Sequence, residues 1–235
     1  EDYERACSDF VEKILDKSRP NEFLDDFVPF QKEVAHYGVF NSLSQTLIKM
    51  TAPGLPDFYQ GSELWDLNLV DPDNRRPVDF DIRARRLDEI AEQAQKSPAK
   101  LAQKLLESPA DGRVKLFLIY RLLKARNEHS ELFQKGEYVP VDVKGQQSDR
   151  IICFARTFQE KWVLTVAPGF LSFLVRPDEI PIGERTWGDT VLVPGPDEPT
   201  EWTSAITGRD IRADKGVSVA EALESFPCEM LIGSK

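Results

Sequence analysis

The chain has 235 residues, 41% of them hydrophobic, which is enough to bury the core of one large domain or of two small ones. Its formal net charge of −10 at pH 7 argues against a nucleic-acid partner, because proteins that bind a phosphate backbone usually carry a basic face. No apolar run approaches the roughly 20 residues that span a bilayer, so we expect no membrane partner either.

Three cysteines, Cys7, Cys153 and Cys228, are scattered along the chain and form no CxxC pair. An odd number of separated thiols fits a reducing cytoplasm better than a disulfide framework or a zinc site. We therefore expect a cytoplasmic protein that uses no cofactor. The chain starts at Glu1 without a methionine or a signal peptide, which predicts that it is part of a longer protein.

The first fifty residues carry apolar side chains at helical spacing in three successive segments. The first covers residues 2–17, and the second begins after Asn21, a good N-cap. Pro29 should kink or split the second helix, and Gly38 and Asn41 precede the third. These helices carry more apolar surface than they can bury against one another, which predicts a further partner. Their apolar stripes are Phe23, Phe27, Phe30 and Val34, then Phe40, Leu43, Leu47 and Met50.

Residues 51–80, TAPGLPDFYQGSELWDLNLVDPDNRRPVDF, interrupt this helical pattern. Pro53-Gly54 supplies a turn, and the short run near residues 56–60 is predicted to be a buried strand. A long loop, residues 61–80, then carries acids, an amide, a tryptophan and paired arginines. A strand followed by a polar loop at its C-terminal end is the arrangement found at the mouth of a β/α barrel.

Residues 81–135 return to helical patterns, and the segment KLFLIYRLLKA within them is apolar on most sides, which predicts a central helix. The group Arg83-Ala84-Arg85-Arg86 is predicted to be a solvated helix face. Near Gly136 the apolar period shortens to about two residues. The short segments that follow predict an antiparallel β-sandwich of roughly 100 residues. Its strands are expected at residues 138–143, 150–158, 162–167, 190–193, 206–211, 217–219 and 229–232.

The run PGLPDFYQGSELWDLNLVDPDNRRPVDF resembles the last barrel strand and the following loop of maltooligosyltrehalose synthases, members of the α-amylase superfamily. The element from Pro53 to Glu63 is shared across much of that superfamily, whereas WDLNLVDPDNRRPVDF is particular to the synthases. TWGDTVLVP, ITGRDI and FPCEMLIG also resemble their terminal sheet domain. The resemblance implies an α+β fold. In it, residues 1–135 are the helical C-terminal part of a (β/α)8 barrel including its last strand, and residues 136–235 are an antiparallel β-sandwich.

The resemblance also implies a reaction, in which the reducing-end α-1,4 link of a maltooligosaccharide becomes an α,α-1,1 link. By superfamily analogy this proceeds with retention through a covalent glycosyl-enzyme, which needs a nucleophilic carboxylate and a carboxylic acid. In that superfamily these groups stand earlier in the barrel, and their motifs do not occur in this sequence. We therefore assign no catalytic residue here and expect the fragment alone to be inactive.

The loop is predicted to shape sugar subsites. Arg75 and Arg76 offer forked hydrogen bonds to sugar hydroxyls, unless they only brace the loop acids. Trp65 can stack on a glucose ring, whereas Tyr59 more simply fills the barrel and Glu63 more simply supports its neighbours. The stretch from residue 71 to 74 resembles a calcium loop, but such residues are ordinary turn formers, so we predict no metal there. The predicted substrate-binding residues are Gln60, Glu63, Trp65, Asp71, Asn74, Arg75 and Arg76.

Two other functions stay open. One is a non-catalytic glucan-binding or interaction module, in which Trp162, Trp187 or Trp202 holds sugar, although most large aromatics in sandwiches are core residues. The other is a different hydrolase or transferase of the superfamily. His36 and His129 are predicted to be surface or packing residues. The expected partners are a maltooligosaccharide, the upstream barrel of the same polypeptide and, through the apolar faces, a second copy of the chain.

Overall fold

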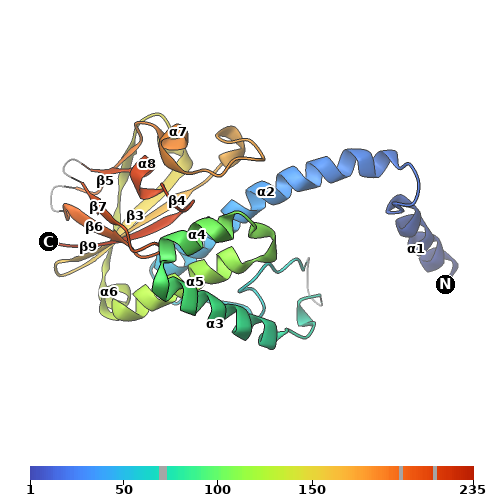
Figure 1. The fold of residues 1–235 in the computed structure, drawn as a ribbon, viewed down its shortest axis with the longest axis horizontal. Helices are drawn as coiled ribbons and strands as arrows, with labels where there is room; N and C mark the ends of the chain where they lie inside the picture. The colour runs from blue at the N-terminus through green and yellow to red at the C-terminus, as the bar shows by residue number, and fades with distance from the viewer. Residues whose placement is uncertain (69–72, 196–197, 214–215) are drawn as a thin grey trace.

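The computed structural model describes residues 1–68, 73–195, 198–213 and 216–235. The N-terminal part is helical and the C-terminal part is built from two antiparallel sheets, so the predicted α+β class is confirmed (Figure 1). None of the helices in these ranges combines the length and apolar character needed to cross a membrane. The helices are α1 (Asp2–Ile14), α2 (Glu22–Thr51), α3 (Phe80–Lys96), α4 (Pro98–Leu106), α5 (Arg113–Glu128), α6 (Ser130–Lys135), α7 (Gly183–Trp187) and α8 (Val219–Ala222).

Helix α1 and the first half of α2 project from the rest of the molecule (Figure 1). We define the N-terminal arm as residues 1–34, none of which is buried. Asn21 caps α2, because its Oδ1 accepts from Leu24 N at 3.2 Å while its Nδ2 donates to Ile14 O at 2.9 Å. Neither the split predicted at Pro29 nor the break predicted at Gly38 and Asn41 occurs, so the second and third predicted helices are one helix, α2, which runs on to Thr51. Pro29 is exposed, so water can satisfy the carbonyl that loses its helical partner.

The second half of α2 packs against α5 and against the larger sheet. Its burial begins at Phe40 and continues through Leu43, Leu47 and Met50. Helix α5 lies at the centre of the helical part, in contact with α2, α3, α4 and α6, as its apolar sequence predicts. Helices and sheets share one hydrophobic core.

The larger sheet has the strand order β1-β3-β4-β9-β6-β7 and the smaller one β2-β5-β8. Strands β3 and β4 form the longest hairpin, with Ile151 opposite Pro168 and Phe158 opposite Lys161. β-branched and aromatic residues fill these strands, as their propensity requires. The strands are β1 (Glu137–Pro140), β2 (Asp142–Lys144), β3 (Ile151–Phe158), β4 (Lys161–Pro168), β5 (Val191–Val193), β6 (Glu201–Ser204), β7 (Asp210–Arg212), β8 (Val217–Ser218) and β9 (Glu229–Ser234).

Three strand predictions are corrected by the structure. Residues 138–143 are not one strand, because β1 ends at Pro140 in the larger sheet and β2 begins at Asp142 in the smaller one. Instead of one strand over residues 206–211, a hairpin of β6 and β7 turns at Gly208, whose φ is +75°. Residues 56–60 do not form a strand. A barrel strand is held by hydrogen bonds to parallel neighbours, whereas the sheet ladders among the described residues are antiparallel.

Arg156 of β3 joins the helical part to the sheet and is only 2% exposed. Its guanidinium donates to Gly136 O at 2.7 Å, to Phe133 O at 3.2 Å and to Thr51 O at 3.4 Å. A cation at the C-terminal ends of α2 and α6 offsets the negative ends of both helix dipoles. Gly136 is needed at this joint, because a Cβ there would lie 2.3 Å from Leu132 O.

Candidate functional site

The loop of residues 61–80 leaves the body of the molecule beyond the C-terminal end of α2, where a second arginine fixes the chain. Arg126 of α5 donates from Nη1 to Met50 O at 2.7 Å and from Nη2 to Gly54 O at 3.2 Å. Gly54 has a φ of +114°, a conformation that favours glycine, so the predicted turn needs this residue. The direction in which the loop starts is therefore set by the helical core.

Residues 55–60 form an irregular link between this turn and the loop. Lys49 donates to Asp57 O, and its Nζ lies 4.4 Å from the centre of the Phe58 ring. Tyr59 is 49% exposed, which differs from its predicted role in barrel filling. Gln60 is exposed in the turn that follows.

Arg83 of α3 fastens both ends of the loop with one guanidinium. Its Nε pairs with Glu63 Oε2 at 3.0 Å and its Nη2 donates to Gly61 O at 2.8 Å. On the other end of the loop, Nη1 donates to Asp79 O at 3.0 Å. The neck of the loop is thus closed by charge-assisted hydrogen bonds, which are stronger than neutral ones. Glu63 has a structural partner here, as its simpler role predicts, and its contact with substrate stays a prediction.

The arginines of α3 were expected to form a solvated face, and the structure corrects this for two of them. Arg83 holds the loop, and Arg86 donates to Asp111 O at 2.7 Å, whereas Arg85 is exposed. The sequence contains a signal for this arrangement. Arg83 and Arg86 lie seven and four residues before the buried Ile90, so they share its face of the helix.

We call residues 61–68 the first limb of the loop. Trp65 holds this limb against the helices. Its Nε1 donates to Pro109 O at 2.7 Å, and Lys115 Nζ lies 5.7 Å from its ring centre. Gly112 makes this contact possible, since a Cβ there would lie 3.0 Å from Trp65 N. Burial, and then the charge of Lys49, lower the pKa of Lys115, while nearby acids oppose that shift. The sequence did not suggest Lys115, and its position inside the apolar segment of α5 was the available signal.

A cavity of about 790 Å³ adjoins this first limb and is lined by Trp65, Asp66 and Lys115 together with residues of α2 and of the segment after Arg176. His36 Nε2 is 3.0 Å from Glu179 O, which ties α2 to that segment. An apolar cavity with a few polar groups is the usual form of a small-ligand site. Of the predicted substrate-binding residues, Trp65 alone is among the described residues that line it.

The other predicted residues lie elsewhere along the loop. Asn74, Arg75 and Arg76 lie in or directly after a short 3-10 helix, Asp73–Arg75, and both arginines are exposed. The Oδ1 of Asn74 is buried without a hydrogen-bond partner in the described part of the chain. Asp71 lies outside the described residues. The structure thus places Glu63 and Trp65 near the start of the loop and Gln60 directly before it. The contacts of all six described residues with substrate stay predictions.

No protein-family profile matches this sequence. A Mycobacterium tuberculosis protein whose name assigns it to the maltooligosyl trehalose synthases is 31% identical over 228 residues, which are 97% of this chain and 25% of that protein. The structure of maltooligosyltrehalose synthase from Arthrobacter ramosus matches with a TM-score of 0.66 at 29% identity, over 92% of this chain and 25% of that one. A crystal structure of another maltooligosyl trehalose synthase matches with a TM-score of 0.63 at 28% identity, over 99% of this chain and 26% of that one.

These matches agree with the motif-based prediction in three ways. The matched proteins carry the name of the same enzyme, and the matches extend over nearly the whole chain. The structural matches also point to the same enzyme as the sequence match. The chain spans about a quarter of the length of the relatives that it matches. The chain is therefore similar, over nearly its whole length, to a part of the maltooligosyltrehalose synthases.

Proposed function

We propose that this chain is the C-terminal part of an intramolecular transglucosylase that converts the reducing-end α-1,4 link of maltooligosaccharides into an α,α-1,1 link. The observation that carries the proposal is 31% identity over 97% of the chain to a protein with the name of that enzyme. The reacting carboxylates belong to the part of the enzyme outside this chain, so this part alone is inactive. Its three free cysteines support a cytoplasmic location.

In this proposal, residues 1–135 complete a catalytic barrel and residues 136–235 form the sheet domain that follows it in the chain. The loop of residues 61–80 closes one side of the glucose pocket. Transfer within one molecule must exclude water, because water would hydrolyse the glycosyl-enzyme. Arg83 holds Gly61, Glu63 and Asp79 together, and Trp65 is hydrogen-bonded to Pro109, which supports this role. Arg75 and Arg76 then hold the glucose unit.

Replacement of Arg76 tests the role of the loop. In the full-length enzyme, Arg76→Ala should raise hydrolysis relative to transfer or weaken substrate binding, because a forked donor to the sugar is lost. Both products are measured from one reaction by chromatography. Arg85→Ala is the matched control, because Arg85 is also an exposed arginine but lies on α3, outside the loop. Unchanged kinetics in Arg76→Ala would remove this residue from the site.

The sheet tryptophans do not support the rival function, in which they would stack on a glucan. Trp162, Trp187 and Trp202 are 8%, 0% and 1% exposed, so they are core residues and offer no stacking surface. A different reaction of the same superfamily is distinguished by the products of the full-length enzyme. A new α,α-1,1 link with no change in chain length supports the proposal, whereas shortened chains indicate a hydrolase.

A further inference from the structure

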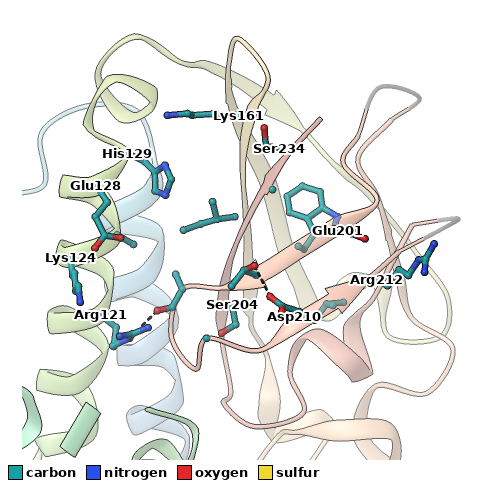
Figure 2. A pocket seen from close by; sticks show the side chains of 18 residues that line it. Arg121, Lys124, Glu128, His129, Lys161, Glu201, Ser204, Asp210, Arg212 and Ser234 are labelled. Atoms are coloured by element: carbon teal, nitrogen blue, oxygen red, sulfur yellow. Dashed lines mark hydrogen bonds between the residues drawn. The ribbon is translucent and has the colours of Figure 1, made fainter. Parts of the chain in front are cut away.

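A cavity of about 850 Å³ lies between the second half of α5 and the edge of the larger sheet. Figure 2 shows Arg121, Lys124, Glu128 and His129 on the α5 side and Glu201 on the sheet side. This cavity is separate from the loop described above. Lys115, which contacts Trp65, precedes Glu128 by 13 residues of α5, a distance of about 20 Å along the helix axis.

The wall of this cavity is rigid. Arg121 Nε donates to Ala205 O at 3.0 Å, which fixes the turn between β6 and β7 to α5. Thr203 Oγ1 donates to Asp210 Oδ1 at 2.8 Å across the hairpin (Figure 2). Gly233 leaves room for the indole of Trp202, because a Cβ there would lie 3.0 Å from Trp202 Cε3. The cavity is therefore part of the folded architecture.

The charges of the wall are mixed and nearly balanced. Four cationic side chains and three carboxylates line the cavity, so a ligand of either charge would meet groups of its own sign. A neutral ligand with many hydroxyls fits better, because each hydroxyl can donate to a carboxylate and accept from a lysine or arginine. Ile211 and Ile232 add apolar surface that matches the C–H face of a sugar ring. The charged residues are Arg121, Lys124, Lys161 and Arg212, with Glu128, Glu201 and Asp210.

Two residues of this wall hold buried polar atoms that have no hydrogen-bond partner in the described part of the chain. They are Trp202 Nε1 and His129 Nδ1. Trp187 and Trp65, in contrast, donate from Nε1 to backbone oxygens at 3.1 and 2.7 Å. Buried polar groups are nearly always paired, so an unmatched donor beside a cavity indicates a partner from outside the chain. Burial, and then the charge of Lys161, lower the pKa of His129, while the charge of Glu128 opposes that shift.

We propose that this cavity is a second carbohydrate site, which binds a segment of a neutral α-glucan away from the loop. The class of ligand, an uncharged polyhydroxylated molecule, follows from the wall of the cavity. The choice of an α-glucan rests on the proposed function. Binding here would hold a long maltooligosaccharide on the enzyme while its reducing end lies in the pocket.

The indole N–H signals of the 235-residue chain test the proposal in ¹H–¹⁵N NMR spectra. Its four tryptophans give one signal each, assigned through single Trp→Phe variants and, where a variant does not fold, by elimination. Titration with maltoheptaose should shift the Trp202 signal and leave that of Trp187 in place. No shift of Trp202 at tens of millimolar maltoheptaose overturns the proposal. A shift of Trp202 by inorganic phosphate but not by maltoheptaose overturns it too, in favour of an anion site.

Glu201→Gln is the informative variant, with Glu137→Gln as its matched control. Both glutamates are exposed on strands of the larger sheet, but Glu137 lies on β1, at the opposite edge from the β6–β7 hairpin. We expect Glu201→Gln to weaken maltoheptaose binding about tenfold by calorimetry, which corresponds to one lost hydrogen bond to a charged group. Equal binding by both variants overturns the proposal.

The same variant separates this inference from the proposed function. In the full-length enzyme, Glu201→Gln should retain formation of the α,α-1,1 link from short substrates and lose efficiency on long ones. A full-length enzyme that forms the link but shows no Trp202 shift refutes the second site alone. An enzyme that never forms the link refutes the proposed reaction, while sugar binding at Trp202 would still support the second site.

Discussion

The two halves of α2 carry similar apolar side chains, but those of the first half are exposed and those of the second half are buried. In the first half, Phe23, Phe27, Phe30 and Val34 are 41–63% exposed. In the second half, Phe40, Leu43, Leu47 and Met50 are at most 4% exposed. A single helix therefore passes from an unpartnered arm into the packed body of the protein (Figure 1).

The geometry of the helix explains this difference. At about 100° of rotation per residue, the stripe of the first half points roughly 150° away from the stripe of the second half. The body of this chain covers the second stripe, so the same body would not cover the first even if α2 were bent less. We therefore predict that any partner of the arm contacts it from the side opposite to the body. In relatives four times as long, the rest of the polypeptide is available for that contact.

The largest expected effect is a contrast in stability between the two halves of α2. Leu47→Ala removes a fully buried side chain and should lower the free energy of unfolding by roughly 2–5 kcal/mol. Phe30→Ala, at a position 63% exposed, should change it by no more than about 0.5 kcal/mol. Urea denaturation of the 235-residue chain measures both. Comparable losses would show that the arm is packed in solution, which would break the comparison.

Glu229 of β9 should make the stability of the body depend on pH. Burial raises the pKa of this carboxyl to about 8, although Ser204 Oγ and Met230 N both donate to it. A raised pKa means that the folded state holds the proton more tightly than the unfolded chain does. The resulting stability is full below the unfolded pKa near 4.5 and is lost as the pH rises towards 8.

Glu229→Gln should remove this loss, because an amide stays neutral. Above pH 8 the variant should be more stable than the parent chain by roughly 2–4 kcal/mol, since each pKa unit corresponds to about 1.4 kcal/mol and water entry limits the full penalty. Denaturation from pH 4 to 9 measures the effect, with Glu33→Gln on the exposed side of α2 as the control. Parallel pH profiles of Glu229→Gln and the parent would refute the assignment.

The sequence predicts those parts of the fold whose signals are local. The helices of residues 2–50 and the antiparallel strands after Gly136 follow from apolar period and propensity. The strand expected near residues 56–60 depends on parallel neighbours, so its own residues do not determine it. The capping joint at Arg156 depends on contacts that span up to 105 residues, which no local pattern reveals.

The candidate site shows the same division. Loop residues 61–80 were found from their composition and from a family motif, because polar and turn-forming residues are concentrated there. The residues that support the loop were not predicted, because the helical spacing that places Arg83 and Lys115 beside apolar residues does not show what they contact. The hydrogen bond from Trp65 to Pro109 crosses 44 residues and requires the packed helices to exist first. The residues that position the loop are thus harder to predict from sequence than the residues of the loop itself.

Arg83 should hold the start and the end of the loop against the packed body of the protein. Arg83→Gln breaks the ion pair with Glu63 and the bonds to Gly61 O and Asp79 O, so the neck should open more easily by roughly 1–2 kcal/mol. Hydrogen exchange of the amides at residues 61–64 measures this opening. Arg85→Gln is the matched control. Faster exchange in both variants, or in neither, would contradict a specific clamp.

The smallest effect on stability should come from the arm, where we expect an effect on association instead. The double substitution Phe27→Gln and Phe30→Gln should leave the free energy of unfolding within about 0.5 kcal/mol of the parent, because neither ring is buried. Exposed apolar stripes favour contacts between molecules, so the variant should self-associate less in analytical ultracentrifugation. Lys32→Gln, at an exposed position of the same helix, controls for the introduction of a glutamine without the loss of an aromatic ring.

In the full-length enzyme the same double substitution should have the opposite pattern, with lower stability of the enzyme and no gain in solubility. The reason is that the stripe is then buried against the rest of the polypeptide, where each lost aromatic ring removes apolar contact area. Differential scanning calorimetry of both proteins makes the comparison. A full-length enzyme as stable as its parent would mean that the arm stays exposed even there, and its stripe would then have to contact another molecule.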